Sequence, residues 1–211
     1  MWPLLRGLAY FFLLIVAWLL VMKLVRRFYQ FPIPGILTEV IDNPIRRRFI
    51  QNPGVIADRM HLAPGMTVVE VGPGKGSYTK AVAERVLPDG KVYAVDIQES
   101  IVERLKRRLE REGITNIIPM VGDAYAFSFE DESIDRVFAI ACLPEIPDPV
   151  RVLRECRRIL RPGGIVSLSE LLPDADYPLR GTEKRWAKEG GLDFMEEYGN
   201  FFTYQLNFVK K

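Results

Sequence analysis

Closely spaced glycines and an acid mark the part of the chain best suited to bind a charged ligand. The stretch "VVEVGPGKG", residues 68–76, has glycines at positions 72, 74 and 76, and Glu70 lies two residues before the first of them. A dinucleotide-binding turn spaces its glycines as G-x-G-x-x-G beside a pyrophosphate. Here the spacing is G-x-G-x-G, and a carboxylate at Glu70 is poorly placed beside phosphates but well placed near a cation. The stretch therefore favours a cationic ligand over a pyrophosphate.

Two further acids follow apolar runs later in the chain. Asp96 ends the run "KVYAVD", twenty residues after Gly76, and Asp123 lies in "VGDA", residues 121–124. A carboxylate at the end of a second parallel strand can accept hydrogen bonds from both hydroxyls of a ribose. Ligands of doubly wound sheets bind outside the carboxyl ends of the strands. We therefore expect these acids and the glycine turn to surround one site.

The elements that position these residues alternate in type. Short β-branched runs alternate with runs of helical periodicity. The predicted strands cover 67–71, 91–96, 116–121, 134–141 and 164–170, and the predicted helices cover 78–87, 100–113 and 148–164. Asp148 is expected to cap the last of these helices, with Pro149 at its first position. This alternation predicts parallel βαβ units and an α/β, doubly wound sheet.

These motifs resemble those of class I S-adenosylmethionine-dependent methyltransferases. The resemblance covers about residues 55–170 and includes the glycine stretch, Asp96, "VGDA" and the "RILRPGG" before the predicted strand 164–170. It implies a Rossmann-like, doubly wound, seven-stranded sheet with an antiparallel last strand. By the same resemblance, the C-terminal "FTYQLNFVKK" forms that last strand, inserted between the fifth and the sixth.

The resemblance also implies S-adenosyl-L-methionine as cofactor and assigns residues to it. Glu70 is expected to help position the methionine ammonium, Ile97 to lie against the adenine, and Asp123 to contact the adenine amino group. Tyr78 either contacts the methionine end or only packs. The residues expected to bind the cofactor are Glu70, Gly72, Gly74, Gly76, Tyr78, Asp96, Ile97, Asp123 and Ala124.

The acceptor side is less well defined by the sequence. The segment "ACLPEIPDP", 141–149, lacks the Asn/Asp-Pro-Pro-Tyr element of many nucleobase and protein-amide methyltransferases. It is more similar to the small-molecule group that includes quinone-biosynthesis and phospholipid methyltransferases. Many of those have a histidine-containing element where this chain has Leu-Pro-Glu at 143–145. Glu145 is therefore the catalytic candidate, as a general base or as a partner for an amine, and the alternative is an exposed loop acid.

Other residues of this region have simpler alternatives. Cys142 is expected to be a small buried residue rather than a nucleophile, and His61 is expected at the surface. Aromatic residues after the fifth strand are candidates to line an apolar acceptor pocket, with helical core packing as the alternative for Trp186. These aromatic residues are Tyr177, Trp186, Phe194 and Tyr198.

The N-terminal segment predicts a membrane anchor. Residues 7–22 contain no charge and would rise about 24 Å as a helix, and flanking residues can extend the helix. We predict a transmembrane helix at 1–27, a juxtamembrane segment at 28–54 and a methyltransferase domain at 55–211; an interfacial or buried helix is the alternative. Lys23, Arg26 and Arg27 predict a cytoplasmic catalytic domain. The expected partners are a lipid bilayer and a hydrophobic or lipid-like acceptor.

Composition excludes several other classes. The 211 residues are 48% hydrophobic and 27% charged, with a net charge of +2. Residues 1–48 have seven basic and two acidic residues, a net charge of +5, and the remainder has a net charge of −3, so no basic nucleic-acid face is predicted. Two cysteines and one histidine at distant positions predict neither a metal site nor a disulfide framework. A nicotinamide-dependent oxidoreductase and a non-catalytic, membrane-tethered cofactor-binding scaffold remain as alternatives to a methyltransferase.

Overall fold

The computed structural model describes residues 43–211 except 173 and 175, and isolated positions before them. Most of the predicted membrane helix at 1–27 and most of the predicted juxtamembrane segment lie outside the described residues. Within the part of the chain that is described, no helix is both long enough and apolar enough to cross a bilayer. The described residues are 6, 7, 10, 11, 13, 14, 17, 21, 43–172, 174 and 176–211.

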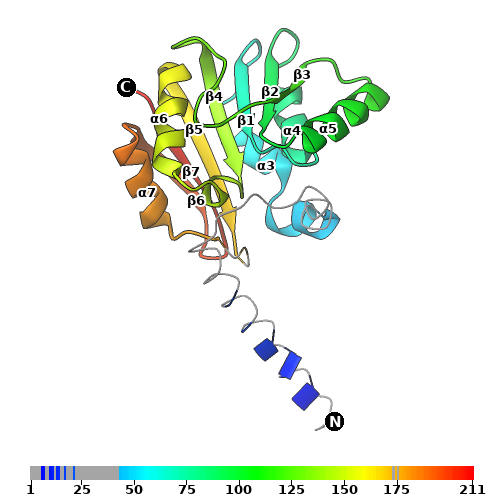
Figure 1. Cartoon of the computed structure of the whole chain (residues 1–211), viewed down its shortest axis with the longest axis vertical. Coiled ribbons are helices and arrows are strands. Elements are labelled where there is room, and N and C mark those ends of the chain that lie inside the picture. The colour runs from blue at the N-terminus through cyan, green and yellow to red at the C-terminus, as the bar shows by residue number, and fades with distance from the viewer. Residues whose placement is uncertain are drawn as a thin grey trace.

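Seven strands form one mixed sheet in the order β3-β2-β1-β4-β5-β7-β6 (Figure 1). The strand pairs β1–β2, β2–β3, β1–β4 and β4–β5 are parallel, and β7 is antiparallel to both β5 and β6. The predicted Rossmann-like sheet is confirmed, including the antiparallel last strand between the fifth and sixth. The strands are β1 (Thr67–Val71), β2 (Lys91–Asp96), β3 (Ile117–Val121), β4 (Ile134–Ile140), β5 (Leu160–Leu171), β6 (Asp193–Gly199) and β7 (Thr203–Val209).

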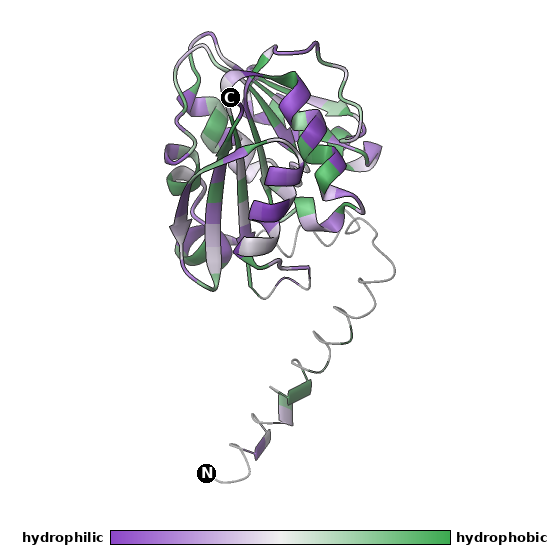
Figure 2. Cartoon of the chain, turned by 90° about the vertical axis from the view of Figure 1, so that its left-hand side faces the viewer, coloured by the Kyte–Doolittle hydropathy of each residue, from purple (hydrophilic) through white to green (hydrophobic). Residues whose placement is uncertain are grey.

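Helices cover both faces of the sheet, and strand side chains alternate between two cores. In β4, Phe138 and Ile140 join the core that includes α3, α4 and α5, while Val137 and Ala139 join the core that includes α6 and α7. This alternation is the two-residue period of a strand buried on both faces, and Figure 2 shows apolar colour along the central strands. The helices are α3 (Pro53–Asp58), α4 (Ser77–Arg85), α5 (Glu99–Glu112), α6 (Pro149–Ile159) and α7 (Arg180–Glu189).

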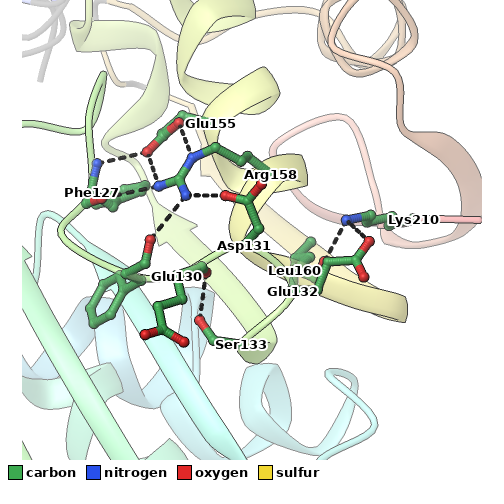
Figure 3. Close-up of polar contacts among 10 residues, drawn as sticks. Phe127, Glu130, Asp131, Glu132, Ser133, Glu155, Arg158, Leu160 and Lys210 are labelled. Atoms are coloured by element: carbon green, nitrogen blue, oxygen red, sulfur yellow. Dashed lines mark hydrogen bonds and ion pairs between the residues drawn. The ribbon is translucent and has the colours of Figure 1, made fainter.

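The largest differences from the sequence prediction are at the junction of α6 and β5 and in β6. The helix predicted at 148–164 ends at Ile159, and β5 begins at Leu160 because Leu160 pairs with Ile134 of β4. The Leu160 carbonyl accepts a hydrogen bond from Lys210 Nζ at 2.7 Å, which binds the C-terminus to the end of α6 (Figure 3). The sixth strand was implied by the resemblance but its residues were not located, because "DFMEEYG" lacks clear alternation and is extended through its pairing with β7.

The loop between β3 and β4 is fixed to α6 by Arg158 (Figure 3). Its guanidinium donates to Glu155 at 2.9 and 2.7 Å, to Asp131 at 2.5 Å and to the Phe127 carbonyl at 3.0 Å. Glu155 in turn accepts the Phe127 amide at 2.8 Å. The hydrogen bonds from Arg158 hold the pKa of Glu155 below its ordinary value. These contacts keep the long β3–β4 connection against the domain.

Candidate active site

The turn after β1 depends on glycines with left-handed backbone. Gly72 (φ +71°) donates its amide to the Val95 carbonyl of β2 at 2.9 Å, and a Cβ added there would lie 2.3 Å from Cys142 Sγ beyond β4. Gly76 (φ +79°) precedes α4, and a Cβ there would lie 2.6 Å from Leu105 Cδ1 of α5. The first glycine therefore lets β1 approach the end of β4 where the strand order reverses, and Gly76 lets α4 approach α5.

Replacing Gly72 by Ala is expected to destabilise the fold by about 3 kcal/mol, because left-handed strain adds to overpacking against Cys142. Gly113→Ala is the matched control: Gly113 has φ +68° and open space around its Cα. It should therefore show only the backbone strain, about 1 kcal/mol. Chemical denaturation of the purified variants measures the loss in free energy of unfolding for each substitution. Equal losses in the two variants would show that contact with Cys142 contributes nothing.

A cavity of about 250 Å³ opens at this turn, beyond the carboxyl ends of the strands. Its wall includes every residue predicted to bind the cofactor except Gly76, and also the catalytic candidate Glu145. The predicted residues on its wall are Glu70, Gly72, Gly74, Tyr78, Asp96, Ile97, Asp123, Ala124 and Glu145. Gly76 lies beside the cavity lining, and its close neighbour is Leu105.

Glu70 presents a buried carboxylate to the cavity from β1. Its side chain is on the same face of the sheet as Val68, towards α4, and it is 1% exposed. The hydroxyl of Thr79, from the first turns of α4, donates to Glu70 Oε2. This contact orients the carboxylate, and a positively charged group in the cavity would compensate its burial.

Asp96 ends β2 and is also buried. Its Oδ1 accepts the Gln98 amide at 2.9 Å, which sets the carboxylate at the start of α5. Burial raises the pKa of Asp96 above its ordinary value, and hydrogen bonding by Gln98 opposes that shift. Ile97 is 63% exposed on the cavity wall, so an apolar surface adjoins the acid. This pairing suits a nucleoside, whose ribose is polar and whose base is flat and apolar on its faces.

Asp123 lies on the loop after β3, and its Oδ1 accepts the Tyr125 amide at 2.8 Å. The loop is joined to β2 through the Gly122 amide, which donates to the Asp96 carbonyl at 3.0 Å. Asp123 and Ala124 therefore adjoin Asp96 on the wall of the same cavity.

The opposite side of the cavity carries two more acids. Glu145 ends the short helical turn Leu143–Glu145 after β4, and Asp174 follows β5. Cys142 lies between this side and the glycine turn, and burial, reinforced by carboxylates that include Glu145, raises the pKa of its thiol well above its ordinary value. A thiol that keeps its proton is not a nucleophile. The expectation that Cys142 is a packing residue rather than a nucleophile agrees with this environment.

A segment before the sheet, within the predicted juxtamembrane segment 28–54, covers the cavity. Arg46, in the helical turn η1 (Arg46–Ile50), lines the cavity and is 7% exposed. Its Nε and Nη2 donate to Gln51 Oε1 at 2.9 and 2.7 Å, and Gln51 Nε2 donates to Ser169 Oγ of β5 at 3.1 Å. The Tyr78 hydroxyl donates to the Gln51 carbonyl at 3.3 Å. Residues 46–51 are thereby fixed to α4 and β5 over the site.

The three adjacent arginines at 46–48 differ in their surroundings. The guanidinium of Arg46 is turned into the protein, where it is buried and bonded to Gln51. Arg47 donates to Ser77 Oγ at 2.8 Å, and Arg48 is exposed. Three adjacent arginines look equivalent in the sequence, since only the fold determines which of them faces inwards. Asp174 was missed for the same reason.

Other candidates lie away from the cavity. His61 is exposed, as expected, and contacts Glu196 of β6. The hypothesis that four aromatic residues line an acceptor pocket is wrong for this cavity, since none of them is on its wall. Tyr177 and Trp186 pack with the core beside α6 and α7, and the two on β6 lie against cationic side chains; the latter are Phe194 and Tyr198.

The groups on the cavity wall fit S-adenosylmethionine. Acids outnumber the two basic residues, Arg46 and Lys75, and the cofactor carries a sulfonium and an ammonium but no phosphate. Asp96 and Ile97 suit its ribose and adenine, and Glu70 suits its ammonium. The fold and this set of groups define a class of enzyme: transferases that use a nucleoside-containing cofactor and have an antiparallel strand inserted in a Rossmann-like sheet.

Comparisons with known proteins indicate the same class. Residues 69–168 match the family described as "Methyltransferase domain". Demethylmenaquinone methyltransferase of Geobacillus stearothermophilus is 33% identical over 119 residues, covering 56% of this chain and 51% of that protein. Protein-L-isoaspartate O-methyltransferase of Methanothrix thermoacetophila is 34% identical over 127 residues, covering 60% of each. The chain therefore spans little more than half the length of these two relatives.

A solved structure shares the fold. The S-adenosylmethionine-dependent methyltransferase of Aquifex aeolicus superposes with a TM-score of 0.78 at 20% identity, covering 84% of this chain and 99% of that one. The family match, the named relatives and this structure together indicate an S-adenosylmethionine-dependent methyltransferase. The names of the two relatives refer to a quinone precursor and to a protein, so they do not define one class of acceptor.

Proposed function

We propose that this chain is a membrane-associated methyltransferase that moves a methyl group from S-adenosylmethionine to a hydrophobic or lipid-like small molecule, such as a phospholipid headgroup or a quinone. The observation that carries the cofactor assignment is the shared cavity of Glu70, Asp96 and the glycine turn. The uncharged residues 7–22 support the membrane and acceptor assignments. A tether raises the concentration of the enzyme near acceptors dissolved in a bilayer.

The chain's own residues bind and align the reactants. The sulfonium activates the methyl carbon, and the protein aligns acceptor, methyl and sulfur and excludes water. Glu70 and Asp96 hold the two ends of the cofactor, while η1 covers the cavity through Arg46. Glu145 and Asp174 face the remaining space, where an acceptor would lie.

Glu145 is proposed as the base that accepts a proton from the acceptor. Exchanging Glu145 for Gln preserves the shape of the side chain but removes the base, so turnover should fall by about 10²-fold or more, while the affinity for S-adenosylmethionine changes little. Asp148→Asn, just outside the cavity lining, is the control. Unchanged turnover in the Glu145 variant would exclude a base at this position, as expected for an acceptor that is already ionised.

Labelled S-adenosylmethionine and a total lipid extract test the function itself. The full chain is incubated with both, and the labelled product is identified by mass. The proposal expects label in a lipid-soluble product. Release of S-adenosylhomocysteine that is no faster with membranes than without them would favour the non-catalytic scaffold instead. Calorimetry with S-adenosylmethionine and with NAD distinguishes the oxidoreductase alternative.

The membrane association is proposed for the cytoplasmic face, because Lys23, Arg26 and Arg27 follow the uncharged residues 7–22. The segment is proposed either to span the bilayer or to lie in its interface. No nucleic-acid substrate is proposed, since residues 49–211 contain 22 basic and 25 acidic residues and so have a net charge of −3.

A further inference from the structure

Large apolar side chains are exposed in two places: in and beside η1, and in the turn that joins β6 to β7 together with Leu179, which precedes α7. We call the set Ile45, Phe49, Ile50, Leu179, Phe201 and Phe202 the docking face. Phe49 is 79% exposed, and Phe201 and Phe202 are 60% and 62% exposed. In Figure 1 the light-blue turn η1 and the turn that joins β6 to β7 both lie at the lower end of the domain, where β4 and β5 point. Clustered exposure of this kind marks an interaction surface.

The β6–β7 turn holds its two phenylalanines outwards. Asn200 Oδ1 accepts the amides of Phe202 and Thr203 at 2.8 and 3.3 Å, which closes the turn. The Tyr177 hydroxyl donates to the Phe201 carbonyl from the core side. The rings of Phe201 and Phe202 meet edge to face, with 5.7 Å between centroids. Since the backbone is fixed on both sides, the two rings form a rigid apolar tip.

The two parts of the docking face lie on either side of the acceptor side of the cavity. Arg46, on the cavity wall, belongs to the same turn as Phe49. Asp174, also on the wall, follows β5, and the end of β5 pairs with β7 directly beside the β6–β7 turn, where Leu171 is opposite Thr203. An acceptor that enters between the two parts would reach Glu145 without crossing the domain.

The charge beside this face identifies its partner. Arg48 is exposed next to Phe49, and Arg47 lies beside it. Aromatic residues with adjacent arginines match the interface of an anionic bilayer, where rings lie at headgroup depth and guanidinium groups meet phosphates. The uncharged residues 7–22 precede this face in the same chain.

We propose that the docking face lies in the headgroup region of an anionic lipid bilayer, so that the acceptor passes from the bilayer directly into the cavity. This inference rests on the proposed function for the nature of the acceptor. It assigns a second membrane contact, separate from residues 1–27, to the β6–β7 turn and η1.

Lipid-borne quenchers test the contact at single positions. Full-length Phe202→Cys and Phe49→Cys variants are labelled with a small fluorophore and reconstituted in vesicles of phosphatidylglycerol and phosphatidylcholine that carry a headgroup-depth quencher. Both labels should lose most of their fluorescence. Asp89→Cys is the matched control, because Asp89 is exposed in the turn before β2, at the opposite end of the sheet, and its label should keep its fluorescence. Labelled wild-type chain corrects for reaction at Cys142 and Cys156.

Quenching of Phe202→Cys no stronger than that of Asp89→Cys would overturn the inference. Labels shielded in detergent only as protein concentration rises would also overturn it, and would identify a second copy of the chain as the occupant. If the wild-type chain transfers methyl groups but the labels at positions 49 and 202 are not quenched, the membrane contact of the docking face is rejected and the proposed function stands. Quenching without any methyl transfer would reject the proposed function and leave the membrane contact in place.

Discussion

Asp96→Asn is expected to weaken the binding of S-adenosylmethionine about a hundredfold. The carboxylate is expected to accept hydrogen bonds from both ribose hydroxyls, and an amide can accept only through its oxygen. A hydrogen bond to a charged group contributes about 1.5–3 kcal/mol, and 1.4 kcal/mol corresponds to tenfold in affinity. The Gln98 amide, which donates to Asp96 Oδ1 at 2.9 Å, can donate to the Asn oxygen as well, so the fold should persist.

Isothermal titration calorimetry at one pH measures the affinity for S-adenosylmethionine. Asp89→Asn, at the end of the sheet opposite the cavity, is the control. Thermal denaturation of both variants without cofactor checks that the fold is intact. An affinity within a few-fold of wild type would show that Asp96 does not hold the ribose. In that case the assignment of the cavity to a nucleoside cofactor would lose its main support.

The second large effect concerns a buried pair of carboxyls next to the acceptor side. Glu170 of β5 and Glu183 of α7 are 1% and 0% exposed. The Tyr204 hydroxyl, which donates to the Pro178 carbonyl at 2.8 Å, and the Glu170 carboxyl both adjoin the buried carboxyl of Glu183. Burial raises the pKa of Glu183 from 4.5 to about 8. Burial and the neighbouring Glu183 also raise the pKa of Glu170.

The direction of the pH dependence follows from proton binding. Between pH 4.5 and about 8, folded Glu183 keeps a proton that the unfolded chain has released. The folded state then binds more protons, so the free energy of unfolding falls as the pH rises through this window. The contribution is fully present below pH 4.5 and is lost near pH 8. At 1.36 kcal/mol per pKa unit, the loss at pH 7 is on the order of 3 kcal/mol.

Glu183→Gln is therefore expected to make the protein more stable at pH 7 by about 2–3 kcal/mol, because a neutral amide avoids this loss. Denaturation at pH 5, 6, 7 and 8 measures the free energy of unfolding of each variant. In Glu183→Gln, the remaining carboxyl of Glu170 should still make this free energy depend on pH, and the Glu170→Gln/Glu183→Gln double variant should remove that dependence. Glu189→Gln, on the exposed side of α7, should keep the wild-type profile. A Glu183→Gln profile as steep as wild type would mean that this carboxyl ionises normally in the folded state.

Much of the fold was predictable because local signals agreed with each other. The strands 67–71 and 91–96 were predicted with their observed ends, since each is a β-branched run that stops at a glycine turn or an acid. The residues of strand β6 were not located because they mix acidic and apolar side chains without alternation and are mostly exposed, and the extension of β6 depends on pairing with β7. The end of α6 was misplaced because Leu160 pairs with β4, a long-range contact that no local pattern reveals.

The cofactor side of the site was predictable for a related reason. Its three acids lie at or just after the carboxyl ends of strands, and parallel strands bring those ends to one edge of the sheet. Glu70, Asp96 and Asp123 were therefore placed together by strand order alone, and the structure puts them on one cavity wall. The acceptor side has no such rule. Arg46 and Asp174 reach the cavity from segments whose positions depend on packing against β5 and α4.

The sequence by itself determined the parallel strands, the glycine turn and the acids at the strand ends, because periodicity and spacing act within short stretches of chain. The antiparallel strand and S-adenosylmethionine were implied by the resemblance to methyltransferases. Only the tertiary structure decided which of three adjacent arginines is buried, which carboxyls lose their contact with water, and which phenylalanines stay exposed. Burial depends on partners distant in sequence, so Arg46, Glu183 and Phe201 acquire their roles only when β5, α7 and the β6–β7 turn are in place.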